Sequence, residues 1–105
     1  MSSPDPIARA RDMVEKHPAS ELVRFSYAKA LFDANQHAEA AEQLQQCVAK
    51  KPDWMVATIL LGRSLVALNR KIEAKQTLER ALELALVQNH VGPRGEVEAL
   101  LDSLR

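Results

Sequence analysis

The sequence predicts an all-α fold: an antiparallel helix-pair solenoid of about six helices, in a single domain of residues 1–105. Apolar residues recur at helical spacing along the chain. Only three of the 105 residues are glycine, and Ala, Leu, Glu and Lys are abundant, which favours helix. Six residues also recur identically 34 positions later: Pro18/Pro52, Leu31/Leu65, Asn35/Asn69, Glu39/Glu73, Ala40/Ala74 and Leu44/Leu78. This period is typical of a helix–turn–helix solenoid, in which each unit buries one face on the next.

The first two helices are bounded by clear start and stop signals. Asp5 is a capping residue and Pro6 is tolerated at the first helical position, so a helix is expected from there to His17–Pro18. Ser20 is the next candidate cap, and it predicts a second helix that continues to about Ala34. Both segments carry their apolar residues at helical spacing.

Asparagine is predicted to make the turns inside each helix pair. Asn35 and its counterpart Asn69 tolerate the left-handed backbone that a tight interhelical turn requires. A third helix is expected over residues 37–50, and Pro52 closes it.

The fourth helix, residues 54–68, is apolar on most sides and should be covered on two faces, with Trp54 as a packing anchor at its start. A fifth helix over residues 71–88 is expected to be longer than its counterpart, because Leu86 replaces the closing proline. Gly92–Pro93 is expected to break the chain. A last amphipathic helix then carries Val97, Leu100, Leu101 and Leu104.

Small residues at fixed places in both units make the chain resemble the tetratricopeptide repeat (TPR) family. The places read Ala28, Ala40, Cys47 and Pro52 in one unit, and Gly62, Ala74, Ala81 and Leu86 in the next. Helices that cross closely have room only for small side chains at the contact. The resemblance implies a right-handed superhelix with whole units at residues 20–53 and 54–89. Residues 5–18 then form the second half of a preceding unit, and residues 93–104 a capping helix.

By the same resemblance, the first helix of each unit lines a concave groove that holds a peptide or helix of a partner protein. The expected groove residues are Leu22, Phe25, Lys29, Phe32 and Asp33 in one unit and Val56, Ile59, Arg63 and Val66 in the next. The groove is then largely apolar, with Lys29 beside Arg63, and this pair of cations favours an acidic contact. In the alternative, the apolar members are covered by the end helices and belong to the core.

One subclass of the family grips the carboxylate terminus of chaperone peptides with a Lys and Asn pair in one unit and further Asn, Lys and Arg in the next. Phe25 and Lys29 stand where that pair would fall, and Leu60 replaces the later Asn. A chaperone cofactor of this type is therefore not expected.

Composition and charge narrow the other classes of function. Fourteen basic residues balance fourteen acidic ones, and four residues are aromatic, so no nucleic-acid partner is expected. The first five residues show no signal peptide, and residues 54–68 are too short and too interrupted to span a bilayer. The single Cys47 fits a reducing compartment. We expect a cytoplasmic protein with no membrane partner.

The remaining candidates for chemistry have structural explanations. Cys47 matches Ala81 in the repeat, which indicates a small buried residue rather than a nucleophile. Glu39 and Glu73 lie near helix starts, where a carboxylate favours the helix dipole. No phosphate-binding loop occurs. No metal-ligand spacing joins the histidines, which are His17, His37 and His90. We therefore expect no enzyme, no cofactor and no metal.

Two functions remain open. The leading hypothesis is a protein–protein interaction module that presents its groove to a partner. The alternative is a self-associating structural subunit of a larger assembly, since short repeat arrays expose apolar ends unless they are capped. The apolar stripe of the last helix would serve as the cap or as the interface in that case.

Overall fold

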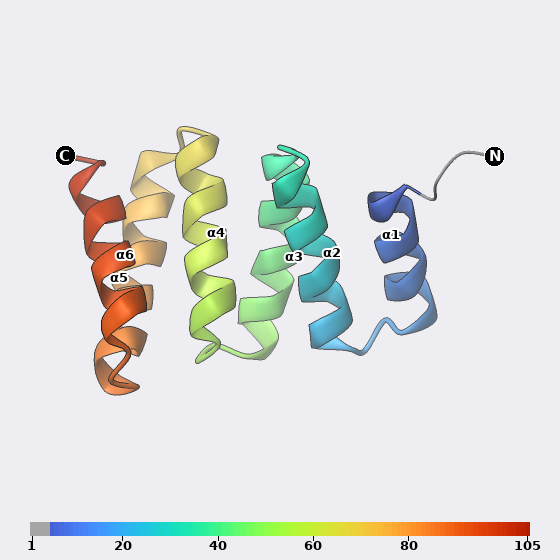
Figure 1. The fold of residues 1–105 in the computed structure, drawn as a ribbon, viewed down its shortest axis with the longest axis horizontal. Helices are drawn as coiled ribbons and strands as arrows, with labels where there is room; N and C mark the ends of the chain where they lie inside the picture. Colours follow the sequence, from blue (N-terminus) through green and yellow to red (C-terminus); the bar gives the residue numbers. More distant parts are fainter. Residues whose placement is uncertain (1–4) are drawn as a thin grey trace.

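The computed structural model describes residues 5–105, which form six α-helices that stack in chain order (Figure 1). Neighbouring helices contact one another along the chain, and α2 also contacts α4. The molecule is elongated, with extents of 46 × 25 × 22 Å. The helices are α1 Pro6–Lys16, α2 Glu21–Asp33, α3 His37–Lys50, α4 Met55–Ala67, α5 Lys71–Val87 and α6 Val91–Asp102. This arrangement confirms the predicted all-α helical solenoid.

The helix starts and turns follow the local sequence. The side chain of Asp5 accepts a hydrogen bond from the Ile7 amide at 3.0 Å, and that of Ser20 accepts one from the Val23 amide at 3.2 Å. Asn35 and Asn69 have φ of 62° and 59°, so both make the left-handed turns that the sequence predicts. Asn89, with φ of 57°, makes a third such turn between α5 and α6 that we did not foresee.

The expectation that Gly92–Pro93 breaks the chain is wrong. Helix α6 begins at Val91, so both residues lie in its first turn. Amides at a helix start have no partner within the helix, and a proline there removes no hydrogen bond. The break lies instead at Asn89. Helix α5 does run past Leu86, and with 17 residues it is longer than α3 with 14.

The core of the fold forms where small residues allow neighbouring helices to pack closely. The repeated small residues are all buried, namely Ala28, Ala40, Cys47, Gly62, Ala74 and Ala81. Helix α4 has eight buried residues, as expected for a helix covered on two faces. The two polar ones, Thr58 and Ser64, donate their hydroxyl protons to the carbonyls four residues earlier at 2.9 Å, so neither hydroxyl is left unpaired.

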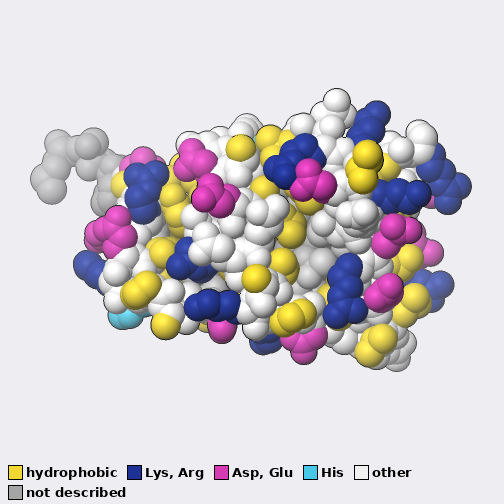
Figure 2. Space-filling view, turned by 180° about the vertical axis from the view of Figure 1, so that it is seen from behind, with side chains coloured by type: hydrophobic (Ala, Val, Ile, Leu, Met, Phe, Trp, Pro, Cys, Tyr) yellow, Lys and Arg dark blue, Asp and Glu magenta, His cyan; other side chains and the backbone are white. Residues whose placement is uncertain are grey.

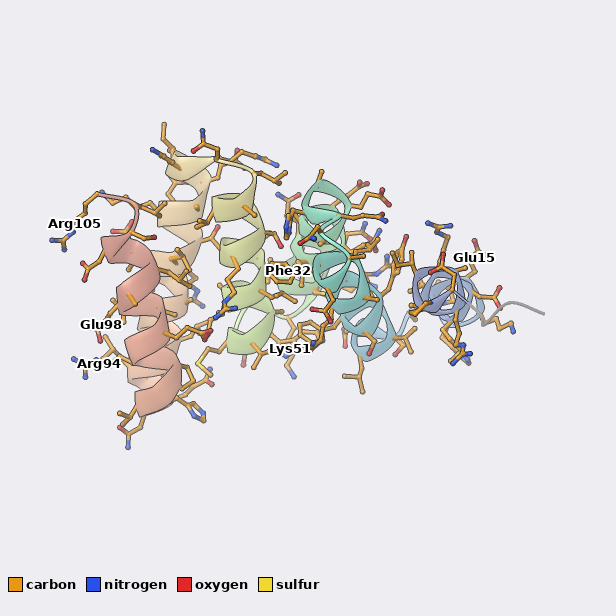
Figure 3. The ribbon with its side chains drawn as sticks, turned by 45° about the horizontal axis from the view of Figure 1, so that its top comes forward. Glu15, Phe32, Lys51, Arg94, Glu98 and Arg105 are labelled. Carbon is orange, nitrogen blue, oxygen red and sulfur yellow. The ribbon has the colours of Figure 1, made fainter. Side chains whose placement is uncertain are left out.

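Helix α6 covers the end of the stack with its apolar stripe. Val97 is fully buried, and Leu100, Leu101 and Leu104 pack against the core as half-buried residues. The outer side carries Arg94 and Glu98, which form an ion pair at 3.4 Å (Figure 3). The apolar stripe of α6 is therefore packed against the core in this structure rather than exposed.

Candidate protein-binding groove

A groove of about 310 Å³ lies between α2, α4 and α6. In Figure 1, α2 and α4 stand in the same layer as α6, in front of α3 and α5. Figure 3 shows Phe32 of α2 between α2 and α4. The residues that line the groove are Phe25, Lys29, Phe32 and Asp33 from α2, Met55, Val56, Ile59, Leu60 and Arg63 from α4, and Pro93 and Glu96 from α6.

Seven of the nine residues proposed from the sequence line this groove. The two that do not are Leu22, which is 68% exposed outside it, and Val66, which is half-buried against the core. Sequence reasoning missed Met55 and Leu60, which neighbour proposed residues on α4. It also missed Pro93 and Glu96, which lie beyond the repeated region.

The wall of the groove is apolar and firmly supported. Ile59 is only 7% exposed and belongs to the core, whereas Phe25 and Phe32 are half-buried and Val56 is 52% exposed. The rings of Phe25 and Trp54 lie 5.0 Å apart, which confirms Trp54 as a packing residue. The alternative that these residues are plain core thus holds for Ile59, whereas Phe25, Phe32 and Val66 are each half-buried.

Each cation of the groove is already paired with a carboxylate. Lys29 Nζ lies 3.2 Å from Asp33 Oδ2 on the same helix, with both side chains exposed. Arg63 Nη2 donates to Glu96 Oε1 on α6, and these two side chains are 41% and 37% exposed. The sequence showed Lys29 and Arg63 recurring together, but it did not show that α6 brings a carboxylate to Arg63.

None of the described cysteine and histidine side chains lines the groove. Cys47 is buried, and burial raises the pKa of its thiol, which keeps it protonated and poorly nucleophilic at neutral pH. The ring of His37 packs edge-on against Phe32, with centroids 4.9 Å apart. Within residues 5–105, no cluster of three or more His, Cys, Asp or Glu could hold a metal ion.

The distribution of surface charge and the length of the helices bear on the class of partner. Figure 2 shows positive and negative side chains interspersed over the face turned away in Figure 1, rather than a patch of one sign. Among the described helices, none combines the length and the apolar character that a bilayer crossing requires.

The structure is that of a helical repeat protein with a groove between α2, α4 and α6. Residues 7–81 match the family model described as anaphase-promoting complex, cyclosome, subunit 3, which is of the tetratricopeptide repeat type. The chain is also 30% identical over 92 residues to the TPR repeat-containing protein PA0015 of Pseudomonas aeruginosa, covering 88% of each chain. It therefore belongs to this tetratricopeptide repeat family.

Solved structures share the fold at low sequence identity. Protein BPP2914 from Bordetella parapertussis superposes with a TM-score of 0.81 at 23% identity, over 99% of this chain and 89% of the other. The TPR2B domain of yeast Sti1, in its complex with pHsp70, has a TM-score of 0.81 at 22% identity, over 93% and 78%. The first TPR of Spaghetti (RPAP3), bound to the HSP90 peptide SRMEEVD, has a TM-score of 0.78 at 24% identity, over 93% and 76%.

Proposed function

We propose that this chain is a protein-interaction module, not an enzyme, and that it binds a short apolar segment of a partner protein in the groove between α2, α4 and α6. The observation that carries the proposal is the composition of the groove. Seven of its eleven lining residues are apolar, and the other four are charged. An apolar trough with a few placed charges suits a peptide or a helix face. The complex of the Sti1 domain with pHsp70 and that of the Spaghetti domain with an HSP90 peptide support the same class of role.

The acidic contact expected at Lys29 and Arg63 stays a prediction of the sequence, and the pairing of both cations argues against it. An acidic segment would have to displace Asp33 from Lys29 or Glu96 from Arg63. The HSP90 peptide SRMEEVD has three acidic side chains and one arginine. Because both cations of the present groove already have carboxylate partners, we propose an uncharged apolar segment as its occupant.

Affinity capture from the native lysate tests the groove with a matched pair of variants. Val56 lines the groove at the second position of α4, and Ile72 lies outside it at the second position of α5. Both are exposed aliphatic residues, at 52% and 77%. Val56→Glu should lose the captured partner, because a carboxylate enters the apolar wall, while Ile72→Glu should retain it. Equal capture by both variants would refute the groove as the binding site.

The self-association alternative is favoured by a separate observation. Three exposed apolar side chains gather where α5 gives way to α6: Leu86 at 51%, Val87 at 84% and Val91 at 80%. Sedimentation velocity over a range of concentrations tests this alternative. Association that disappears in Val87→Asp with Val91→Asp would support a subunit contact at this junction, and a monomer at all concentrations would remove the alternative.

A further inference from the structure

We propose that Glu96 is a specificity-determining residue of the groove. By holding the guanidinium of Arg63, it makes the groove select uncharged apolar segments and disfavour acidic ones. The proposal rests on the proposed binding function, and it adds the chemistry by which that site chooses between partners.

The geometry places Glu96 where an occupant would meet it. Glu96 and Pro93 are the contributions of α6 to the groove lining, and Glu96 is the lining residue that reaches across to α4. Both members of the Arg63–Glu96 pair remain partly exposed, so a segment in the groove contacts the pair directly. The pair is thus part of the binding surface.

Arg63 depends on Glu96 for its neutralisation. Among the described residues, Glu96 supplies the one side-chain acceptor that the guanidinium reaches, and the Nε atom of Arg63 is buried with no partner. A charge beside apolar walls interacts more strongly than one in open water. Without the carboxylate of Glu96, the groove would present an unbalanced cation to its occupant.

Lys29 does not depend on α6 in this way. Its carboxylate partner is Asp33, four residues further along the same helix, and both are well exposed. A loss of charge at position 96 therefore changes the groove from balanced to net positive through Arg63 alone. The selection of partners should follow the state of this single pair.

Display of random short peptides on phage tests the proposal with a set of four related proteins. These are the wild type, Glu96→Gln, the double variant Arg63→Gln with Glu96→Gln, and Glu98→Gln. The last is a matched control, because Glu98 lies two residues away on the outer side of α6 and pairs with Arg94 (Figure 3). Val56→Glu serves to identify the peptides that bind in the groove.

The wild type and Glu98→Gln should enrich apolar peptides depleted in Asp and Glu. Glu96→Gln should enrich acidic peptides. In fluorescence anisotropy, the tightest of these peptides should bind to Glu96→Gln with about tenfold higher affinity than to the wild-type protein. The double variant should return to the wild-type selection, because it removes the freed cation as well.

The remaining outcomes separate this proposal from the one on which it rests. If the wild type and Glu96→Gln select the same groove-dependent peptides, the role of Glu96 is refuted and the binding function stands. If Glu96→Gln selects acidic peptides but the double variant does so too, Arg63 is not the cation responsible. If no peptide depends on Val56, both proposals fail.

Discussion

Leu78 of α5 packs directly onto Gly62 of α4. A Cβ atom added to Gly62 would lie 2.5 Å from Leu78 Cδ2 and 2.8 Å from Leu78 Cγ. Leu78 is fully buried and has little room to move away. The spacing of α4 and α5 is thus set by the absence of a side chain at position 62, and α4 in turn carries five of the groove residues.

Gly62→Ala should lower the free energy of unfolding by about 1–2 kcal/mol. Overpacking a core costs about 1–3 kcal/mol, and the better helix propensity of alanine offsets part of this. Thermal and urea unfolding followed by circular dichroism measure the change. Gly95→Ala in α6 is the matched control, because an added Cβ there meets no atom within 4 Å. That variant should be slightly stabilised, and an equal loss in both would disprove the packing explanation.

Asn69→Ala should destabilise the chain by about 1 kcal/mol, whereas Asn69→Gly should be nearly neutral. The backbone at this residue has φ of 59°, where a Cβ without a compensating polar group is disfavoured. Urea unfolding of the two variants gives the comparison. Similar losses for alanine and glycine would mean that the asparagine side chain, rather than the left-handed backbone, accounts for the stability.

Phe25→Ala should shift the emission of Trp54 to the red, because the indole loses the ring that lies 5.0 Å away. Trp54 is the single tryptophan, so its fluorescence reports this contact without interference. The substitution removes a half-buried ring and should cost about 1–2 kcal/mol of stability. Phe32→Ala is the control, since Phe32 contacts His37 edge-on instead. A red shift in both variants would indicate a general loosening of the fold.

Cys47 should resist thiol reagents in the folded chain and react only as the chain unfolds. Its side chain is fully buried, and desolvation raises the pKa of the thiol. Colorimetric titration with an aromatic disulfide, with and without denaturant, measures the difference. Fast modification under native conditions would show that the site opens readily.

The same shift predicts a pH dependence of stability. The unfolded chain releases the thiol proton at a lower pH than the folded chain, because the folded pKa is raised. The contribution of the thiol to the free energy of unfolding is therefore fully present below the pKa of the unfolded chain, about 8.5, and is lost as the pH rises toward the pKa of the folded chain. Thermal unfolding from neutral to alkaline pH should show this fall in the wild type. The Cys47→Ala variant should lack this fall. Alanine is the residue at the equivalent position of the repeat, Ala81.

The helices could be predicted because their signals are local. Asp5 and Ser20 cap the helices that follow them, and Asn35 and Asn69 mark left-handed turns. The start of α6 could not be predicted in this way. Gly92 and Pro93 are compatible both with a break and with the first turn of a helix, and only the turn at Asn89 decides between them.

The groove residues that occupy repeated positions could be predicted from the sequence. Phe25, Phe32 and Ile59 occupy repeated positions on the first helices, so their common face follows from helical spacing. Val66 has the same spacing but does not line the groove, because it packs half-buried against two core clusters. Periodicity indicates which residues share a face, but it does not indicate how much of that face stays open.

The sequence by itself determined the architecture, since a 34-residue period with small residues at fixed places requires helix pairs that stack closely. Only the tertiary structure decided the charge of the groove. Arg63 and Glu96 lie 33 residues apart on helices that are not consecutive, and the longer α5 removes α6 from the spacing of the repeat. Such a contact depends on where α6 comes to rest against α4, and no local pattern encodes that position.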